Sequence, residues 1–354
     1  MSIPTEPIGS VPRPQYLLDA VRAHAAGQID AAALDAAYDH AVQETIREFE
    51  ATGSPIVTDG EQAKSSFATY PLHGISNLAP DGAVIPFADG HTRQLPRLTD
   101  GPFRYGVRAG SFLARAKHYA TRPLKQAVIA PSALSLLYPQ SGLPGYAREQ
   151  FIQDLVAEAV ADIRSCLEGG AVSVQLDFTE GRLAVKLDPS RGLLRHFVDL
   201  NNAVLSRFDD AERRRIGIHT CPGGDHDSTH SADVDYGELL PELFRLEAGN
   251  FFIQLASEPD RARVLALIRA HARPSQRIFV GVTDPIDPRV ETADDVAERV
   301  LEAARFIEPE RLGTTDDCGF SPFADDVSTS RAIAFAKIAA RVEGTDLAAR
   351  RLGL

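Results

Sequence analysis

Hydrophobic positions along the chain follow two different spacings. Over residues 148–168, apolar side chains recur every three or four positions, as on the buried face of a helix. The same spacing predicts helices over 29–52, 192–206, 235–246, 259–271, 294–306 and 328–342. Short apolar runs lie between the helices and predict buried strands over 7–10, 55–61, 125–131, 172–177, 215–221, 250–256, 277–284 and 312–318.

Strands and helices therefore alternate, and most of the eight expected strands are followed by a helix. Alternation with short connections predicts parallel strands and right-handed crossovers, and eight such units predict a closed (β/α)8 barrel. An open doubly wound sheet is the alternative, but no G-x-G-x-x-G follows the first strand. Residues 66–124 break the rhythm and predict an inserted excursion of loops, short strands and one helix. No composition shift marks a linker, so residues 1–354 are expected to form a single domain.

Composition narrows the class of protein. The formal net charge of -12 argues against a nucleic acid or an anionic membrane as partner, because both require a basic face. No apolar run is long enough to cross a membrane, and the first residues do not look like a signal peptide. Three cysteines make a disulfide framework improbable, which fits a cytoplasmic protein. Cys166 falls in a helical apolar pattern and is expected to be a core thiol.

Polar residues gather at the expected strand ends. In a (β/α)8 barrel the reactive side chains lie at the carboxyl ends of the strands, which meet on one face. The residues at or near these ends are Ser10, Glu61, Asp177, Cys221, Gln254, Asp284 and Cys318. The agreement supports both the barrel and a site on that face.

A soft metal site is the sharpest hypothesis for this face. His219 and Cys221 stand two residues apart at a strand end, so an extended chain points both side chains the same way. Cys318, at another strand end, adds a third ligand of the kind that zinc prefers, and a fourth tetrahedral position stays open for a substrate. The alternative is a buried histidine and small core thiols.

Five short motifs, in this order, resemble the cobalamin-independent methionine synthase superfamily. They are Ile8-Gly9-Ser10, Asp59-Gly60-Glu61, Val174-Gln175-Leu176-Asp177, His219-Thr220-Cys221 and Asp317-Cys318-Gly319. The resemblance covers nearly the whole chain and only the catalytic barrel that forms the C-terminal half of full-length members.

The resemblance implies a zinc ion that binds a substrate thiol as thiolate and presents it to an electrophilic carbon. His219, Cys221 and Cys318 match the zinc ligands of the family. The positions that hold the carboxylate and amine of homocysteine match Ile8, Ser10, Glu61 and Asp177, and the last two are the expected catalytic pair.

The departures from the family concern the metal and the methyl donor. Gln254 stands where the family has a glutamate ligand, so a three-ligand site and a site that includes Gln254 both stay open. The chain has no tryptophan, and Leu136 or Leu137 occupies the place of the residue that stacks on the pterin. Ile286 stands in place of a proton-transferring histidine. Methyl-tetrahydrofolate is therefore expected to be a poor donor.

The sequence thus predicts a zinc-dependent S-alkyltransferase whose partners are a small-molecule thiol and an alkyl donor. Methyl transfer to homocysteine or a related thiol is the first expectation. Epoxide opening of the epoxyalkane:coenzyme M transferase type is the second, with Tyr70, His73, His226 and His230 as open candidates for its proton donor. A metal-free barrel that binds a small molecule or acts as a lyase is the third. The oligomeric state is left open, a homo-oligomer included.

Overall fold

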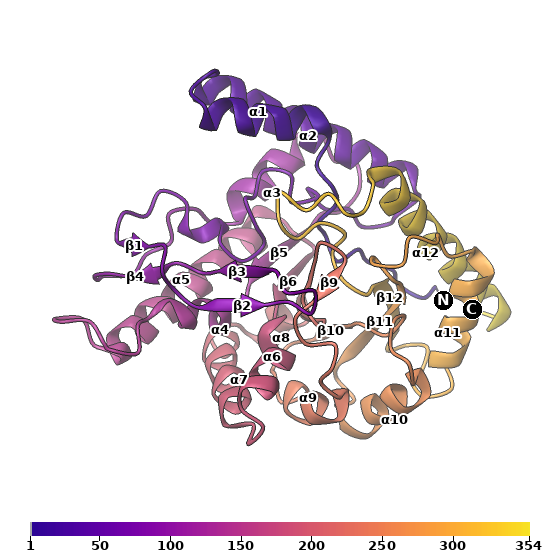
Figure 1. Ribbon diagram of the computed structural model, residues 1–354. Coiled ribbons are helices and arrows are strands. Elements are labelled where there is room, and N and C mark those ends of the chain that lie inside the picture. Colours follow the sequence, from indigo (N-terminus) through magenta and orange to yellow (C-terminus); the bar gives the residue numbers. More distant parts are fainter. Residues whose placement is uncertain (1) are drawn as a thin grey trace.

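The computed structural model describes residues 2–354 and is built around a parallel sheet of six strands (Figure 1). In spatial order the strands are β12 (Leu312–Asp316), β11 (Arg277–Thr283), β10 (Asn250–Ile253), β7 (Ile216–Thr220), β6 (Ser173–Asp177) and β5 (Lys125–Ile129). Neighbours in space are also neighbours along the chain, as expected for successive right-handed β-α-β units.

Two further segments close the sheet into a barrel. Thr5 pairs in parallel with Thr314 of β12 at one edge, and Val57 pairs in parallel with Leu124, next to β5, at the other. The two segments then meet each other, since the Val11 amide donates to the Gly60 carbonyl at 3.2 Å. The strands expected near residues 7–10 and 55–61 are therefore present as short bridged segments, and the predicted (β/α)8 barrel is confirmed.

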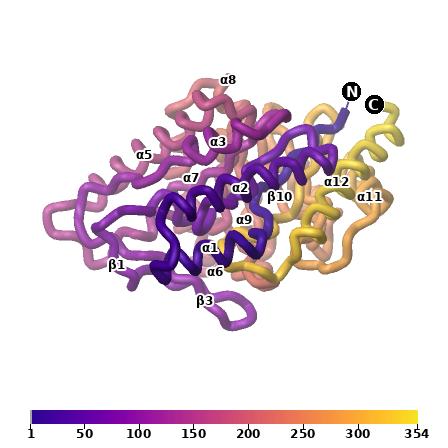
Figure 2. The backbone as a smooth tube through the Cα atoms, turned by 90° about the horizontal axis from the view of Figure 1, so that it is seen from above, coloured from indigo at the N-terminus to yellow at the C-terminus, as the bar shows by residue number. Residues whose placement is uncertain are grey.

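Helices surround the barrel on its outer side (Figures 1 and 2). Those that the apolar spacing predicts are α2 (Ala31–Ala51), α5 (Arg148–Gly169), α7 (Gly192–Leu205), α9 (Tyr236–Leu243), α10 (Arg261–His271), α11 (Ala293–Ala303) and α12 (Arg331–Arg351). Cys166 of α5 is fully buried, as expected for a core thiol. Within residues 2–354, no helix combines the length and the apolar character needed to cross a membrane.

The structure also corrects the helix assignment. It contains α1 (Gln15–Ala25), α4 (Pro131–Leu134), α6 (Glu180–Leu187) and α8 (Asp210–Arg213), which the apolar spacing does not reveal. Of these, α4 and α8 have only four residues each. The last helix, α12, continues nine residues past the expected end at 342, to Arg351. Gly344 lies inside this helix and allows α12 to pack closely against α11. A Cβ at this position would lie 2.4 Å from the Cβ of Val296.

The excursion at 66–124 has the predicted mixed character. It holds a short 3-10 helix (Tyr70–Leu72), the antiparallel pairs β1 (Leu78–Ala79) with β4 (Arg97–Leu98) and β2 (Val84–Pro86) with β3 (Thr92–Gln94), and the helix α3 (Gly110–Lys117). The β2–β3 hairpin reaches the turn formed by β8 (Gly224–Asp225) and β9 (Ser228–Thr229), where the Ala88 amide donates to the Thr229 carbonyl at 3.0 Å (Figure 1).

Aromatic side chains fill the barrel interior. Phe252 and Phe279 stack at 4.6 Å between ring centroids, and the Lys125 ammonium lies 3.5 Å from the centroid of Phe252. Gly217 and Gly313 make room for these rings, since a Cβ at either position would lie 2.4 Å from a phenylalanine ring atom. Large and small side chains therefore alternate across neighbouring strands, as in packed barrel interiors.

One buried ion pair links the closing segment to the rest of the barrel. The Arg341 Nε of α12 lies 3.0 Å from Asp316 Oδ1, and an Arg341 guanidinium nitrogen donates to Thr5 Oγ1 at 2.6 Å. Replacing Arg341 with Met would leave the buried Asp316 carboxylate without its cation. We predict a loss of about 3–5 kcal/mol in the free energy of unfolding, measured by urea denaturation.

The matched control lies on the same helix. Arg351 pairs with Asp294 and Glu298, both largely exposed, so Arg351→Met should cost at most about 1 kcal/mol. Equal losses in the two variants would contradict the view that Arg341 helps to close the barrel.

Candidate functional site

Three side chains expected to bind a metal lie together at the carboxyl end of the barrel. His219 is the fourth residue of β7, Cys221 follows that strand, and Cys318 follows β12. Their ligand atoms all lie within 4.8 Å of one another, and the Cys221 and Cys318 sulfurs are 3.1 Å apart. The barrel thus brings together residues nearly one hundred positions apart in the sequence.

The two sulfurs lie within hydrogen-bonding distance of each other. A hydrogen bond from the Cys221 thiol lowers the pKa of Cys318 well below its ordinary value, and that bond together with burial raises the pKa of Cys221. The short contact therefore favours the thiolate form of Cys318. A thiolate is the form of cysteine that binds metals.

The imidazole of His219 completes a donor set suited to a soft divalent metal. The side chain is buried, and neither ring nitrogen has a hydrogen-bond partner among residues 2–354. A buried polar group without a partner is costly, and a metal ion is one group that would satisfy it. One nitrogen and two sulfurs at this separation fit a zinc-type centre with an open position.

A pair of carboxylates lies beside the three side chains. Asp177 ends β6, faces His219 across the strand pairing, and accepts a hydrogen bond from Gln175 at 2.6 Å. Burial raises the pKa of Asp177 to about 7, although His219 opposes and Glu61 adds to this shift. Glu61 differs in having its own cation, because the Lys64 ammonium lies 3.0 Å from Glu61 Oε1. Among residues 2–354, Asp177 is therefore the member of this pair that has no ion-pair partner.

Local backbone geometry presents Glu61 to this region. Gly60 and Glu61 both have positive φ angles, 65° and 57°, and the Glu61 amide donates to Asp59 Oδ1 at 2.9 Å. Arg13 holds the turn from the other side by donating to the Glu61 carbonyl at 2.8 Å. A non-glycine residue in the left-handed region is strained, and such strain is found mainly at functional sites.

One cavity of about 380 Å³ connects these groups. The residues expected to form the site that line it are Ile8, Ser10, Glu61, Asp177, His219 and Cys318. Cys221 lies just behind, fully buried. Ser10 packs closely against the cysteine loop, since a Cβ on Gly319 would lie 2.0 Å from its Oγ. Most of the remaining wall is apolar, so polar contacts inside the cavity are strengthened by exclusion of water.

Gln254 lies differently from the other expected site residues. Its Oε1 accepts a hydrogen bond from Arg182 at 3.0 Å, and its Nε2 donates to Ser257 at 2.6 Å. The oxygen that would bind a metal thus faces a guanidinium, which is itself paired with Glu258 at 2.9 Å. Gln254 lines a second, neighbouring cavity, together with Cys318.

Asp317 holds the loop that follows β10 in place. Its carboxylate accepts from the amides of Leu255, Ala256 and Ser257 at 2.7–2.8 Å. Burial raises the pKa of Asp317 to about 7, and the nearby Asp284 adds to the effect. Asp317 therefore anchors the chain after β10 beside Cys318.

The wall of the cavity contains aromatic residues that the sequence pattern leaves unassigned. Leu136 lines the cavity, whereas Leu137 is buried in the core. Phe67 and Phe87, both from the excursion, also line the cavity. Aromatic surface is therefore present without a tryptophan, which weakens one of the two arguments that methyl-tetrahydrofolate is a poor donor. That expectation stays a prediction.

Of the candidate proton donors, the structure brings one to the cavity. His230 lines it, with its ring against Gly223, where a Cβ would lie 1.8 Å from Nε2. Burial, followed by Lys186 and Arg182, lowers the pKa of His230 to about 4, so the ring is neutral at pH 7. His73 and His226 are exposed, and Tyr70 is buried with its hydroxyl on Asp162.

Glu180, the first residue of α6, is a wall residue that sequence reasoning does not select. It is buried, and burial raises the pKa of its carboxyl to about 8. The sequence holds one signal, an acid three residues after Asp177 at the end of the same expected strand. Its surroundings, however, come from α4 and α7, which sequence spacing does not connect.

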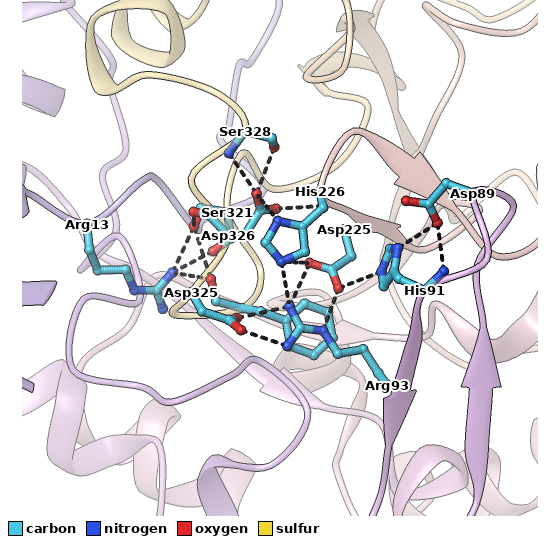
Figure 3. Close-up of polar contacts among 11 residues, drawn as sticks. Arg13, Asp89, His91, Arg93, Asp225, His226, Ser321, Asp325, Asp326 and Ser328 are labelled. Atoms are coloured by element: carbon cyan, nitrogen blue, oxygen red, sulfur yellow. Dashed lines mark hydrogen bonds and ion pairs between the residues drawn. The ribbon is translucent and has the colours of Figure 1, made fainter. Parts of the chain in front are cut away.

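A charged network includes two residues that line the cavity, Arg93 and Asp325 (Figure 3). Arg93 of the β2–β3 hairpin lies between two carboxylates, donating to Asp225 at 3.0 Å and to Asp325 at 2.9 Å. His91 lies 3.1 Å from the other oxygen of Asp225 (Figure 3). The Arg93 guanidinium also lies 4.2 Å from the ring centroid of Phe323. We call Arg93, His91, Asp225 and Asp325 the cover network.

A second group of side chains has ligand atoms close enough together to bind a metal ion, and it shares Asp225 with the cover network. Asp225, His226 and Asp326 have ligand atoms within 4.8 Å of one another. Arg93 already donates to Asp225 and lies 3.2 Å from His226 Nε2. A guanidinium therefore supplies the positive charge there, and the group serves to hold the hairpin, the β8–β9 turn and the 321–328 loop together.

The fold and the site are those of a (β/α)8-barrel enzyme. One histidine and two cysteines, the residue types that bind soft metal ions, lie beside two buried carboxylic acids. A family model described as the cobalamin-independent synthase catalytic domain matches residues 3–341. The chain belongs to this family.

Curated relatives and solved structures agree with this assignment. The chain is 23% identical to the methionine synthase of Sulfurisphaera tokodaii, over 99% of this chain and 94% of the relative. It is likewise 23% identical to that of Saccharolobus solfataricus, over 99% and 96%. Among structures, a B12-independent methionine synthase from Shewanella sp. W3-18-1, in complex with selenomethionine, has a TM-score of 0.78 at 17% identity and 99% coverage of both chains. A putative one from Listeria monocytogenes has a TM-score of 0.73 at 20% identity and 98% coverage of both.

The cover network makes a local prediction. Arg93→Met removes the cation between Asp225 and Asp325, so the hairpin should open more often. We predict that hydrogen exchange over residues 84–94 and 224–229 becomes about 10- to 100-fold faster, the equivalent of losing a charge-assisted hydrogen bond.

Arg97→Met is the matched control, because Arg97 lies on the same excursion and pairs only with the largely exposed Asp81. It should leave exchange in both segments unchanged. Unchanged exchange in Arg93→Met as well would show that the network does not hold the cover.

Proposed function

We propose that this protein is a zinc-dependent S-methyltransferase that transfers a methyl group to the sulfur of homocysteine or a closely related amino-acid thiol. Residues 1–354 would act as one barrel domain. Membership of the family supports the reaction class, and the relatives named methionine synthase support homocysteine as acceptor. The observation that carries the proposal is the meeting of His219, Cys221 and Cys318 with two buried carboxylates around one cavity.

His219, Cys221 and Cys318 would hold the metal. When bound, zinc supplies the positive charge that removes the proton from a substrate thiol, whose ordinary pKa of about 8.5 keeps it mostly protonated at neutral pH. Gln254 would stay outside the ligand set, because Arg182 already donates to its oxygen. That hydrogen bond supports a three-residue centre with one position left for the substrate sulfur.

Asp177 and Glu61 would hold the ammonium group of the acceptor. Both are buried on the cavity wall, and Asp177 has no cation of its own within ion-pair distance among residues 2–354. Ile8 and Ser10, at the end of the first barrel segment, would position the carboxylate. This pair of acids favours an amino-acid thiol over a sulfonate thiol such as coenzyme M, since a sulfonate would meet two like charges.

Positioning would supply much of the remaining catalysis. The ends of five barrel segments fix the sulfur, the ammonium group and the cavity for the donor relative to one another. Such alignment of two reactants can contribute on the order of 7 kcal/mol or more to lowering the barrier. The apolar wall excludes water, which would otherwise compete for the donor carbon and solvate the sulfur.

The metal assignment predicts the behaviour of two cysteine variants. Wild-type protein should bind about one zinc per chain, and Cys318→Ser should lose nearly all of it without unfolding. Metal analysis after dialysis, with circular dichroism to check the fold, measures both. Cys166→Ala is the control, since Cys166 is fully buried in α5, and it should keep its zinc. Full occupancy in Cys318→Ser would refute the assignment.

The acceptor assignment predicts a selective loss of thiol binding. Asp177→Asn removes the charge that pairs with the ammonium group, and a charge-assisted hydrogen bond contributes about 1.5–3 kcal/mol. The Kd for homocysteine should therefore rise by roughly 10- to 100-fold, while zinc content stays the same. Isothermal titration measures the Kd, with an amine-free thiol of similar size as the comparison ligand. An unchanged Kd for homocysteine would point to an acceptor without an amine.

A further inference from the structure

Glu180 is a buried acid for which the proposed reaction, as described so far, has no use. It is 5% exposed and lines the same cavity as Leu136, Leu183 and Asp177. Its Oε1 accepts a hydrogen bond from Ser132 Oγ, while its Oε2 is buried without a hydrogen-bond partner. Among residues 2–354, no lysine, arginine or histidine lies within ion-pair distance of it.

The hydrogen bonds around Ser132 indicate that the Glu180 carboxyl is neutral. Ser132 Oγ lies within hydrogen-bonding distance of two oxygens. One is Glu180 Oε1, and the other is Asn201 Oδ1, at 3.0 Å. The Asn201 oxygen is fixed as an acceptor because it also accepts from the Ser132 amide at 3.3 Å. The Ser132 hydroxyl has one proton and can donate it to only one of these two oxygens. If Glu180 were ionised, the hydroxyl oxygen would face the other oxygen with no proton between them. A protonated Glu180 supplies the missing proton.

The electrostatic surroundings point the same way. The other titratable or charged groups on the cavity wall are Glu61, Arg93, Asp177, His219, His230, Cys318 and Asp325. Among these, Asp177 is the one whose negative charge raises the pKa of Glu180 and so opposes ionisation. The start of α6 favours a carboxylate, and hydrogen bonds from Ser132 and from the backbone amides of Glu180 and Ala133 also lower the pKa. Burial is the largest effect and outweighs them, so the pKa is raised to about 8.

We infer that Glu180 is the general acid of the transfer and gives its proton to the nitrogen or oxygen atom that leaves the alkyl carbon. The inference rests on the proposed function. The acceptor sulfur forms a bond to the carbon, the carbon–nitrogen or carbon–oxygen bond breaks, and its electron pair stays on the leaving atom. The carboxyl proton moves to that atom, and Ser132 donates to the resulting carboxylate. Glu180 takes up a proton from water before the next turnover.

The inference defines the chemical class of the donor. A leaving atom that needs a proton belongs to a neutral donor, either a tertiary amine or an epoxide. A sulfonium or a methylcorrinoid gives a leaving group that requires no proton. The two neutral sources share one chemistry, and methyl-tetrahydrofolate and propylene oxide serve as their probes. Because Glu180 would take over the role of the missing histidine, ordinary turnover with methyl-tetrahydrofolate would support this inference and contradict the expectation that this donor is poor.

The test measures turnover of Glu180→Gln, which keeps the shape and a hydrogen-bond donor but has no acidic proton. With zinc-loaded enzyme and homocysteine, kcat for the neutral donor that the wild type uses should fall about 100-fold or more. The wild-type kcat should decline as pH rises through about 8, and the variant should lack this decline. Glu149→Gln is the control, because Glu149 occupies the first turn of α5 but is exposed; it should behave as wild type.

A second measurement is independent of activity. The pKa of Glu180 is about 8 in the fold against an ordinary value of 4.5. Over this range the unfolded chain has lost the proton and the folded chain keeps it, so wild-type stability falls as pH rises. The Tm of Glu180→Gln relative to wild type should therefore increase steadily from pH 5 to pH 8. A Tm difference that does not change with pH would overturn the inference.

The outcomes separate this inference from the proposed function. Turnover only with S-methylmethionine or methylcobalamin would leave the proposed function intact and overturn the inference, as would normal turnover of a neutral donor by Glu180→Gln. No turnover by zinc-loaded wild type with any of the four donors would overturn the proposed function and the inference with it.

Discussion

The pairing of the N-terminal segment with the last barrel strand is the contact on which the site depends. Thr314 donates to the Pro4 carbonyl at 2.9 Å and accepts from the Glu6 amide at 3.0 Å. These bonds bring the first and last barrel segments side by side, and Ser10 then packs against the loop that carries Cys318. Because all strands run parallel, closing the barrel at this seam gathers residues from Ile8 to Cys318 on one face.

The charges gathered on that face are only partly compensated. Glu61 has Lys64 and Asp325 has Arg93, but Asp177 and Glu180 have burial without a cation. Isolated buried carboxyls destabilise a fold, and they persist mainly where a ligand or a reaction uses them. The family assignment and the cavity account for Asp177 as the partner of a substrate ammonium group. Glu180 is accounted for only if the donor side of the cavity also needs an acid.

The amino-acid pattern locates the strand ends well, because parallel strands end in a recognisable change from apolar to polar residues. For that reason His219 and Cys318 can be connected from the sequence alone, although nearly one hundred residues separate them. The pattern fails where long-range packing decides the outcome. Arg182 lies in α6, a helix that the apolar spacing does not reveal, and its hydrogen bond occupies the oxygen of Gln254, a candidate ligand that the family motifs leave open. The cover network likewise joins an inserted hairpin to distant loops through side chains that look like ordinary surface charges.

The central claim is that a substrate sulfur joins one histidine and two cysteines at a zinc centre. X-ray absorption at the zinc edge, recorded on zinc-loaded protein before and after addition of homocysteine, tests it most directly. The account predicts a first shell with two sulfur atoms, from Cys221 and Cys318, that gains a third when homocysteine is added. A shell of only oxygen and nitrogen atoms, or a sulfur count that homocysteine leaves unchanged, would contradict it.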